Sequence, residues 1–211
     1  MSKAPSRSAW REARRRDARA DLLSTAWEIV REDGLGGLSL RDLARRAGIT
    51  TPTVYAYFES KNAIYDAMFG EAAHSFAEMK AEPLEGADAQ INLVTEAQRF
   101  VDFCTSDVAR YQLLFQHLIP GFNPSPESYA PAVRALELTR EHLADNGAPA
   151  PAHCDIWTAL TTGLVDQQIA NDPGGDRWIR LIDEVVAMFL AHCASDPRSS
   201  ENGVMTSRHT H

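Results

Sequence analysis

The 211-residue sequence lacks the features of a membrane protein or a secreted protein. Its longest apolar run, Val185 to Ala191, is far shorter than the roughly 18 residues that a membrane-spanning helix requires. No hydrophobic core of a signal peptide follows Met1, so we expect a protein that is not secreted. Cys104, Cys154 and Cys193 are far apart and odd in number, which excludes a disulfide framework and fits a reducing compartment. We predict a soluble, cytoplasmic protein without a membrane partner.

The sequence also lacks the short motifs that mark common enzyme and metal sites. It contains no HExxH, no Cys-x-x-Cys, no GxSxG and no phosphate-binding loop. The glycine-rich stretch from Gly34 to Gly37 follows a helical pattern instead of a strand, so it is no dinucleotide fingerprint. His153 and Cys154 are adjacent and point in different directions on a helix, which prevents them from pairing as base and nucleophile. We predict that the protein is not an enzyme and needs no cofactor or metal.

Charge is distributed unevenly along the chain. The net charge of −8 argues by itself against a nucleic-acid partner, but residues 1–61 hold 12 basic and 8 acidic side chains, and the remaining residues hold 9 and 21. The basic excess lies in the N-terminal part, which therefore becomes the candidate for DNA binding. Within residues 1–19 the arginines predict an arm that follows phosphates or enters the minor groove, and a merely solvated arm is the alternative.

The most informative stretch, residues 38–61, predicts two short helices joined by a tight turn, as in a helix-turn-helix. Ser39 precedes apolar residues at helical spacing and has Asp42 three residues later, as in a capping box. Gly48 supplies the left-handed position at which the first helix ends. Thr50 is the predicted N-cap of the second helix, which we expect to enter the major groove of DNA.

The second short helix has one apolar face and one face suited to DNA. Val54 and Phe58 lie four residues apart and are predicted to face the core. Lys61 falls in the first turn of the next helix, where a cation is disfavoured unless an anion binds there, so it is predicted to contact a phosphate. The opposite face carries small, apolar-tipped or hydroxylated side chains that suit thymine methyls, base edges and phosphates, from Thr51, Thr53 and Tyr57.

The segment SLRDLARRAGITTPTVYAYFESKNAIYDAM, behind a longer amphipathic helix, resembles the DNA-binding domain of the tetracycline-repressor (TetR) family. The resemblance covers residues 21–68, and its most specific part is the ending Tyr-x-Tyr-Phe-x-Ser-Lys. It implies an all-helical dimer whose C-terminal domain binds a small molecule that controls DNA binding. The family's base-facing positions fall on Arg41, Thr51, Pro52, Thr53 and Tyr55, and its phosphate-facing positions on Tyr57 and Lys61. Ala56 departs from the family, which often has a larger side chain there, so no contact is assigned to it.

The whole chain is predicted to be all-α, with about nine helices and no strand alternation. An N-terminal three-helix helix-turn-helix domain is followed by a helical ligand-binding and dimerisation domain. The predicted parts are a basic arm (1–16), the DNA-binding domain (17–62), the ligand-binding and dimerisation domain (63–194) and a disordered tail (195–211). Predicted helices cover residues 17–33, the two short helices, 61–79, 87–105, a helix from 107, 128–146, 151–171 and 176–193, and the proline-rich stretch 120–126 is a loop.

The predicted C-terminal domain offers candidates for a ligand pocket and for a dimer interface. Aromatic and weakly polar side chains could line an apolar pocket, although ordinary core packing is the alternative for each of them. The pocket candidates are Phe103, Tyr111, Phe115, His117 and Trp157. The last two helices have wide apolar faces that could close a two-fold four-helix bundle or be buried within one subunit. The interface candidates are Leu160, Leu164, Leu181, Val185, Met188 and Phe189.

Together, the residues and the resemblance predict a sequence-specific DNA-binding transcriptional regulator. We expect a repressor that binds a palindromic operator in double-stranded DNA as a homodimer and is released by a small apolar effector. The alternative is a helical protein-interaction module without DNA binding, against which the presence of Tyr57 and Lys61 argues.

Overall fold

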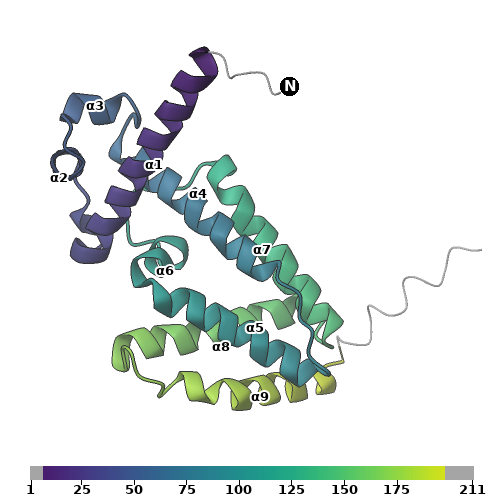
Figure 1. The fold of residues 1–211 in the computed structure, drawn as a ribbon. Helices are drawn as coiled ribbons and strands as arrows, with labels where there is room; N and C mark the ends of the chain where they lie inside the picture. Colours follow the sequence, from purple (N-terminus) through teal and green to yellow (C-terminus); the bar gives the residue numbers. More distant parts are fainter. Residues whose placement is uncertain (1–6, 198–211) are drawn as a thin grey trace, which may run out of the picture. The chain divides into compact units, whose positions relative to one another are not determined.

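The computed structural model describes residues 7–197, and all regular structure in this range is helical (Figure 1). The predicted all-α class is confirmed. The described residues form two compact units, one of residues 7–72 and 109–129, the other of residues 73–108 and 130–197. Residues 1–6 of the predicted arm and residues 198–211 of the predicted tail lie outside the described range.

The first helix, α1 (Arg7–Asp33), begins earlier than the predicted start at Asp17. The predicted arm is therefore wrong for residues 7–16, which are helical. The physical reason is that no glycine or proline interrupts the chain from Arg7 to Asp33, while alanine, arginine and glutamate, all good helix formers, are frequent. The C-terminal half of α1 buries the predicted apolar stripe, made of Leu22, Leu23, Ala26, Trp27, Ile29 and Val30.

A short 3-10 turn, η1 (Leu35–Gly37), leads into α2 (Leu40–Arg46). The Ser39 hydroxyl accepts a hydrogen bond from the Asp42 N–H at 3.1 Å, which confirms the predicted N-cap. Gly48 has φ of 66°, and the Ile49 N–H donates to the Ala44 carbonyl at 3.0 Å, closing the end of α2 as predicted. These bonds fix where α2 begins and ends.

The second short helix, α3 (Thr51–Tyr55), is followed by the longer α4 (Lys61–Lys80). Val54 and Phe58 are fully buried, as predicted. Thr50 stands at the N-cap, but its hydroxyl bonds with the Thr53 hydroxyl at 2.9 Å and makes no backbone cap. An N-cap side chain usually accepts a hydrogen bond from the N–H of the second or third helical residue. Here the second residue, Pro52, has no N–H, and the N–H of the third, Thr53, already donates to the Thr50 carbonyl.

The rest of the first unit comes from later in the chain. It contains almost all of α6 (Val108–Phe115), the loop that follows, and the start of α7 (Pro126–Asp145). Tyr111 and Leu113 of α6 are buried, and the Phe122 ring lies 5.8 Å from the ring of Tyr65 on α4. The compact unit thus extends beyond the predicted domain boundary at residue 62, because these side chains pack on α4.

The second unit contains α5 (Ala89–Ser106), most of α7, α8 (Pro151–Asn171) and α9 (Ile182–Ser195). In this unit α5 packs against both α8 and α9 (Figure 1). The bounds of α8 agree with the prediction, whereas the predicted ninth helix begins only at Ile182, after a 3-10 turn, η2 (Ile179–Leu181). The Gln168 side-chain carbonyl accepts the Trp178 N–H at 3.0 Å, which holds the chain in a turn before α9.

The second unit also buries an ion pair. Lys80 and Glu96 are 3% and 1% exposed and are hydrogen-bonded to each other, and His142 Nδ1 lies 3.1 Å from the other Glu96 oxygen. Burial alone would raise the pKa of Glu96, but the His142 hydrogen bond and the Lys80 charge together lower it below its usual range. The charge of the buried Lys80 ammonium group is therefore neutralised by the Glu96 carboxylate.

The turn after α2 gives a first prediction. Replacing Gly48 with alanine adds a Cβ atom at positive φ without any clash, so Gly48→Ala should cost about 1 kcal/mol of unfolding free energy from backbone strain alone. Gly36→Ala is the matched control, because Gly36 is equally open and has no positive φ. Urea unfolding of both variants would measure the difference, and equal stabilities would contradict the assigned role of Gly48.

Candidate nucleic-acid interface

The predicted DNA-contacting residues come from three neighbouring helices of the first unit and the turn between two of them. Pro52 and Tyr55 of α3 are exposed and Thr51 and Thr53 are half-buried, while Val54 holds the other side of the helix in the core. Tyr57 follows α3 and is half-buried. The short helix therefore presents hydroxyl, methyl and aromatic groups on one open face, the chemistry that base edges and thymine methyls require.

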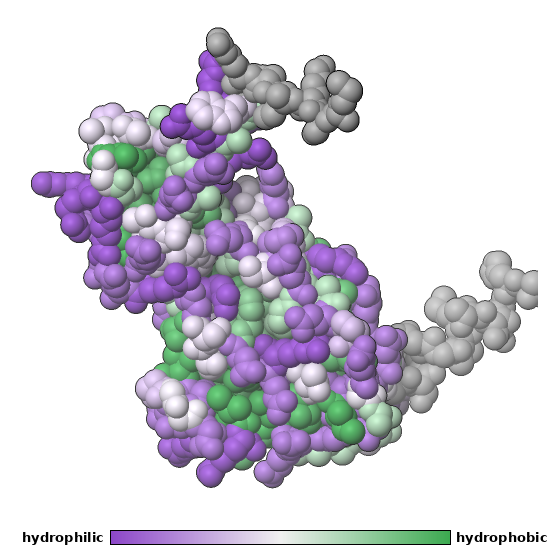
Figure 2. All heavy atoms as spheres, viewed as in Figure 1, coloured by the Kyte–Doolittle hydropathy of each residue, from purple (hydrophilic) through white to green (hydrophobic). Residues whose placement is uncertain are grey.

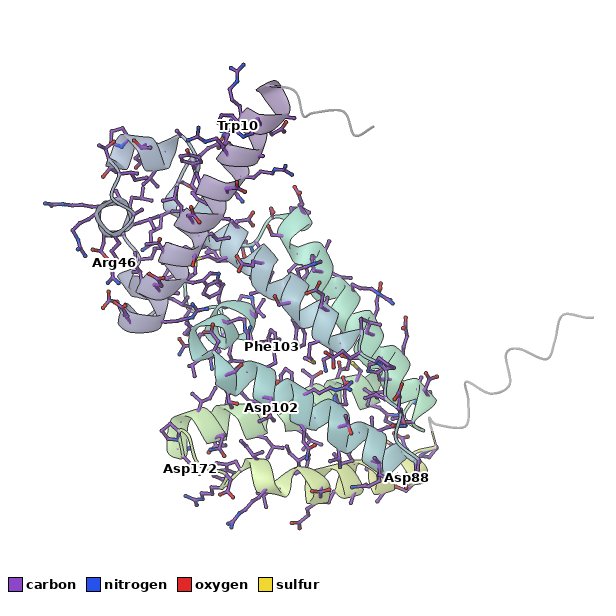
Figure 3. All side chains as sticks on the ribbon, in the orientation of Figure 1. Trp10, Arg46, Asp88, Asp102, Phe103 and Asp172 are labelled. Carbon is purple, nitrogen blue, oxygen red and sulfur yellow. The ribbon has the colours of Figure 1, made fainter. Side chains whose placement is uncertain are left out.

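The three arginines of α2 differ in their availability. Arg46 pairs with Glu32 and Asp33 at the end of α1, at 2.6 and 3.5 Å (Figure 3). Arg45 pairs with Asp42, and the hydrogen bond from Arg45 is the largest of the effects that lower the pKa of that carboxyl group. Arg41 is exposed and makes no ion pair with another described residue, so it is the arginine of α2 that is available to an anion.

Lys61 lies at the N-terminal end of α4, which begins with this residue. The Ser60 hydroxyl accepts the Ala63 N–H at 3.1 Å and caps the helix. The first turn contains no acidic side chain, so the positive end of the helix dipole is uncompensated. The Lys61 ammonium nitrogen lies 5.3 Å from the centre of the Tyr65 ring. The first N–H groups of α4 lack an intrahelical partner. This arrangement can bind a phosphate group.

The N-terminal half of α1 carries a basic surface. Sequence analysis predicted an arm for this part of the chain. Arg15 donates to the Ala56 carbonyl at 3.0 Å, and the Arg19 guanidinium lies 4.6 Å from the centre of the Phe58 ring. Both contacts hold α1 against the end of α3, and Figure 2 shows a hydrophilic surface along this half of α1. A shallow hollow of about 650 Å³ is lined here by Arg11, Glu12, Arg15, Arg16, Arg19 and Tyr57.

The predicted ligand residues are divided between the two units. Phe103 of α5 (Figure 3) and Trp157 of α8 lie in the second unit, and both are buried, so each serves the core there. Tyr111, Phe115 and His117 lie in the first unit, with the rings of Tyr111 and Phe115 5.5 Å apart.

A cavity of about 500 Å³ does lie within the first unit, and His117 is the predicted ligand residue that lines it. Sequence analysis did not predict the other lining residues, because they come from segments far apart in the chain. The one sequence feature that indicates this cavity is the density of apolar side chains around the proline-rich loop. The lining residues are Leu35, Phe69, Leu113, Leu114, His117, Leu118, Ile119, Phe122, Asn123, Pro124, Pro126 and Tyr129.

The predicted interface residues on α8 and α9 differ in exposure. Phe189 is 2% exposed, with its ring centre 5.2 Å from that of Trp157, and Leu164 is also buried within the unit. Met188 is 63% exposed, and half-buried positions are taken by Leu160, Leu181 and Val185. Small side chains are exposed nearby, at Ala159, Gly163, Ala187 and Ala191. The exposed surface of these two helices is thus rich in small residues.

Residues 7–197 contain neither a membrane-spanning helix nor a candidate metal cluster. No helix there is both long enough and apolar enough to cross a membrane. No group of three or more histidine, cysteine, aspartate or glutamate side chains is placed to hold a metal ion in this part of the chain.

The capped α2, the glycine turn and the open face of α3 define a helix-turn-helix DNA-binding domain, here joined to a helical unit. Residues 22–68 match the family model of bacterial regulatory proteins of the tetR family. The chain is 27% identical over 218 aligned residues to the HTH-type transcriptional regulator Rv1816 of Mycobacterium tuberculosis, covering 89% of this chain and 90% of that protein. It is 30% identical over 105 residues to the HTH-type transcriptional repressor KstR2 of Rhodococcus jostii, covering 48% of this chain and 52% of that protein.

The fold is also found in solved structures. A tetR-family transcriptional regulator from Streptomyces coelicolor superposes with a TM-score of 0.68 at 20% identity, covering 88% of this chain and 86% of that chain. The chain carries the DNA-binding domain of the tetR family of bacterial regulatory proteins in residues 22–68. It is a DNA-binding transcriptional regulator, and the resemblance found in the sequence is confirmed.

The unequal availability of the α2 arginines gives a second prediction. Arg41→Ala should weaken DNA binding by about 1–3 kcal/mol, because the free guanidinium is lost from the interface. Arg45→Ala is the control: it removes the same charge from the same helix, but from a side chain already paired with Asp42. Fluorescence anisotropy with a labelled duplex would compare the two, and a larger loss for Arg45→Ala would contradict this assignment.

Proposed function

We propose that the protein is a repressor that binds a palindromic operator through α3 and leaves it when a small apolar effector binds. The observation that carries this proposal is the open face of α3, flanked by the unpaired Arg41 and by Lys61 at the start of α4. In this reading Arg41, Thr51, Pro52, Thr53 and Tyr55 contact bases, while Tyr57 and Lys61 hold phosphates. The protein would act in the cytoplasm, where it reaches chromosomal DNA.

The operator would be bound by a homodimer. A two-fold dimer places two copies of α3 in successive major grooves, about 34–36 Å apart, so that the DNA site is a palindrome. We assign the dimer contact to the exposed face of α8 and α9, centred on Met188 and Gly163. Small side chains on this face allow two pairs of helices to approach closely. Phe189 and Leu164 would support the face from inside the unit.

Release of the operator would follow from thermodynamic linkage between DNA binding and effector binding. An effector that prefers a conformation in which the paired α3 helices no longer match the operator lowers DNA affinity by its difference in affinity for the two conformations. The same coupling makes DNA lower the affinity for the effector. The name of the relative KstR2 describes a repressor, which supports the proposed sign of regulation.

Selection of bound duplexes from a random DNA pool by the purified protein tests the proposal. Enrichment of a palindrome would support a sequence-specific dimer. Enrichment of no sequence, by a folded and effector-free protein, would instead favour a helical protein-interaction module without DNA binding.

The selected duplex then permits a third prediction about separate roles. Lys61→Ala should weaken binding to specific and random DNA alike, and should lower the salt slope by roughly 0.9, the value for one lost phosphate contact. Thr53→Ala should leave the salt slope unchanged and alter the preference at one position in each half-site. Salt titrations of both variants on both duplexes measure these effects, and identical behaviour of the two variants would refute the division of roles.

A fourth prediction concerns the dimer. Met188→Glu places a charge in the middle of the proposed contact, where it would be desolvated, so the variant should be monomeric at micromolar concentration. Val133→Glu is the matched control, because Val133 is 44% exposed on α7, outside the proposed contact. Light scattering after size-exclusion chromatography gives both masses. A dimeric Met188→Glu variant would show that the contact lies elsewhere.

A further inference from the structure

The segment that matches the family's DNA-binding domain has no excess of positive charge. Residues 22–68 hold five basic and six acidic side chains. Two of the five basic side chains, Arg45 and Arg46, are already paired with carboxylates of α1 and α2. Attraction between basic side chains and phosphates supplies essentially all of the sequence-independent affinity of a protein for DNA. Another part of the protein therefore has to provide this attraction.

The N-terminal half of α1, residues 7–19, carries the charge that residues 22–68 lack. It holds six arginines against two acidic side chains, Glu12 and Asp17, and it lies outside the residues that match the family model. Because this segment is helical, Arg11, Arg15 and Arg19 follow one another at spacings of four residues and share one face. Figure 1 shows this half of α1 running past the end of α3. The helix thus gathers into one surface the charge that an extended arm would spread out.

This basic face is continuous with the predicted DNA-contacting surface. The hollow of about 650 Å³ beside α1 is lined by four arginines, by Glu12 and by Tyr57, and Tyr57 is the predicted phosphate-facing residue that follows α3. Arg15 donates to the Ala56 carbonyl at 3.0 Å, which joins α1 directly to the end of α3. A duplex that reaches Tyr57 therefore also meets the arginines of α1.

The four arginines of the hollow have different surroundings. Arg15 is held by Ala56, and the Arg19 guanidinium is held 4.6 Å from the centre of the Phe58 ring. Arg11 and Arg16 are exposed, and Arg16 makes no ion pair with another described residue. A guanidinium group can bind a phosphate through two parallel hydrogen bonds. With one carboxylate against four guanidinium groups, the hollow is suited to an anion of this kind.

We propose that the N-terminal half of α1 is a second DNA-binding surface, which holds phosphates of the duplex that α3 reads and does so without regard to base sequence. This surface supplies the sequence-independent affinity, whereas α3 supplies the sequence preference. The inference rests on the proposed role of α3, but on neither repression nor an effector. Residues 7–19 rise roughly 20 Å along the axis of α1, the length of about six base pairs, and lengthen the contacted DNA accordingly.

Removal of two arginines tests this surface, which is the fifth prediction. Arg11→Ala/Arg16→Ala removes two charges at exposed positions and places a good helix former at each of them. In the full-length protein, the double variant should bind a random-sequence duplex and the selected duplex more weakly by the same factor, roughly tenfold at physiological salt. The salt slope should fall by roughly 1.8 per bound chain, the value for two lost phosphate contacts. An unchanged slope, or a loss confined to the selected duplex, would overturn the proposal.

Two further double variants separate phosphate contact from other effects. Arg11→Lys/Arg16→Lys keeps both charges and loses the planar guanidinium groups, so it should keep the salt slope and retain affinity for the random duplex within about threefold. A loss as large as that of the alanine variant would refute contact through charge. Arg134→Ala/Arg140→Ala removes the same charge from exposed positions of α7 and should leave the slope unchanged. If it weakens binding as much as the α1 variant, the effect is one of net charge and the proposal fails.

Amide hydrogen exchange locates the contact independently of any substitution. A saturating random-sequence duplex should slow exchange at residues 7–16 by about threefold or more and leave residues 130–145 unchanged. Protection of residues 51–55 without protection of residues 7–16 would overturn the proposal and leave DNA binding through α3 in place. Selection that enriches no palindrome, together with salt-dependent binding of the random duplex and protection of residues 7–16, would remove the proposed repressor function and leave this surface in place.

Discussion

Two adjacent residues of α4, Tyr65 and Asp66, connect segments of the first unit that lie far apart in the sequence. The hydroxyl of Tyr65 donates to the Leu35 carbonyl, and burial raises the pKa of Tyr65 to about 12, so this donor stays protonated. Asp66 accepts from the Ser125 N–H, the Ser125 hydroxyl and the Ser128 hydroxyl, at 2.6, 3.0 and 2.9 Å. Gly70, one turn further along α4, gives Ser128 the room to approach. Because α4 also begins at Lys61, one helix positions the proposed phosphate-binding end, the turn before α2 and the start of α7.

The ion pairs around α2 determine which basic groups remain available to DNA. Glu32, Asp33 and Asp42 neutralise Arg45 and Arg46. The pairs of Arg46 with Glu32 and Asp33 also attach α2 to the end of α1. Exposed pairs of this kind add little to stability, so their main effect is on the electrostatic field that an approaching duplex meets. The excess positive charge is thereby concentrated on Arg41, on Lys61 and on the N-terminal half of α1. A protein with an acidic overall composition can then still present a basic surface at the helix-turn-helix.

The features that could be predicted are those encoded by neighbours in sequence. Ser39 and Gly48 delimit α2 through local hydrogen bonds, and Pro151 marks the start of α8, so these boundaries were predicted correctly. The helical state of residues 7–16 was missed because the high arginine content was taken to indicate an arm, although nothing in the segment breaks a helix. The cavity was missed for a different reason. Its walls join Leu35 to Tyr129, and no local pattern shows that such distant segments meet.

The two units differ in how much a ligand could change them. In the second unit the buried polar groups of two clusters are paired: Lys80 with Glu96, and His153, whose Nδ1 accepts the Ala150 N–H at 3.2 Å while Nε2 lies 3.3 Å from Asp196. Moving these groups apart would leave charges buried without partners, which is costly, so this unit is suited to be a fixed platform for the proposed dimer contacts. The first unit has empty space beside η1, and apolar side chains can move into that space without losing hydrogen bonds. The first unit, which also carries α3, therefore has space for its apolar side chains to rearrange.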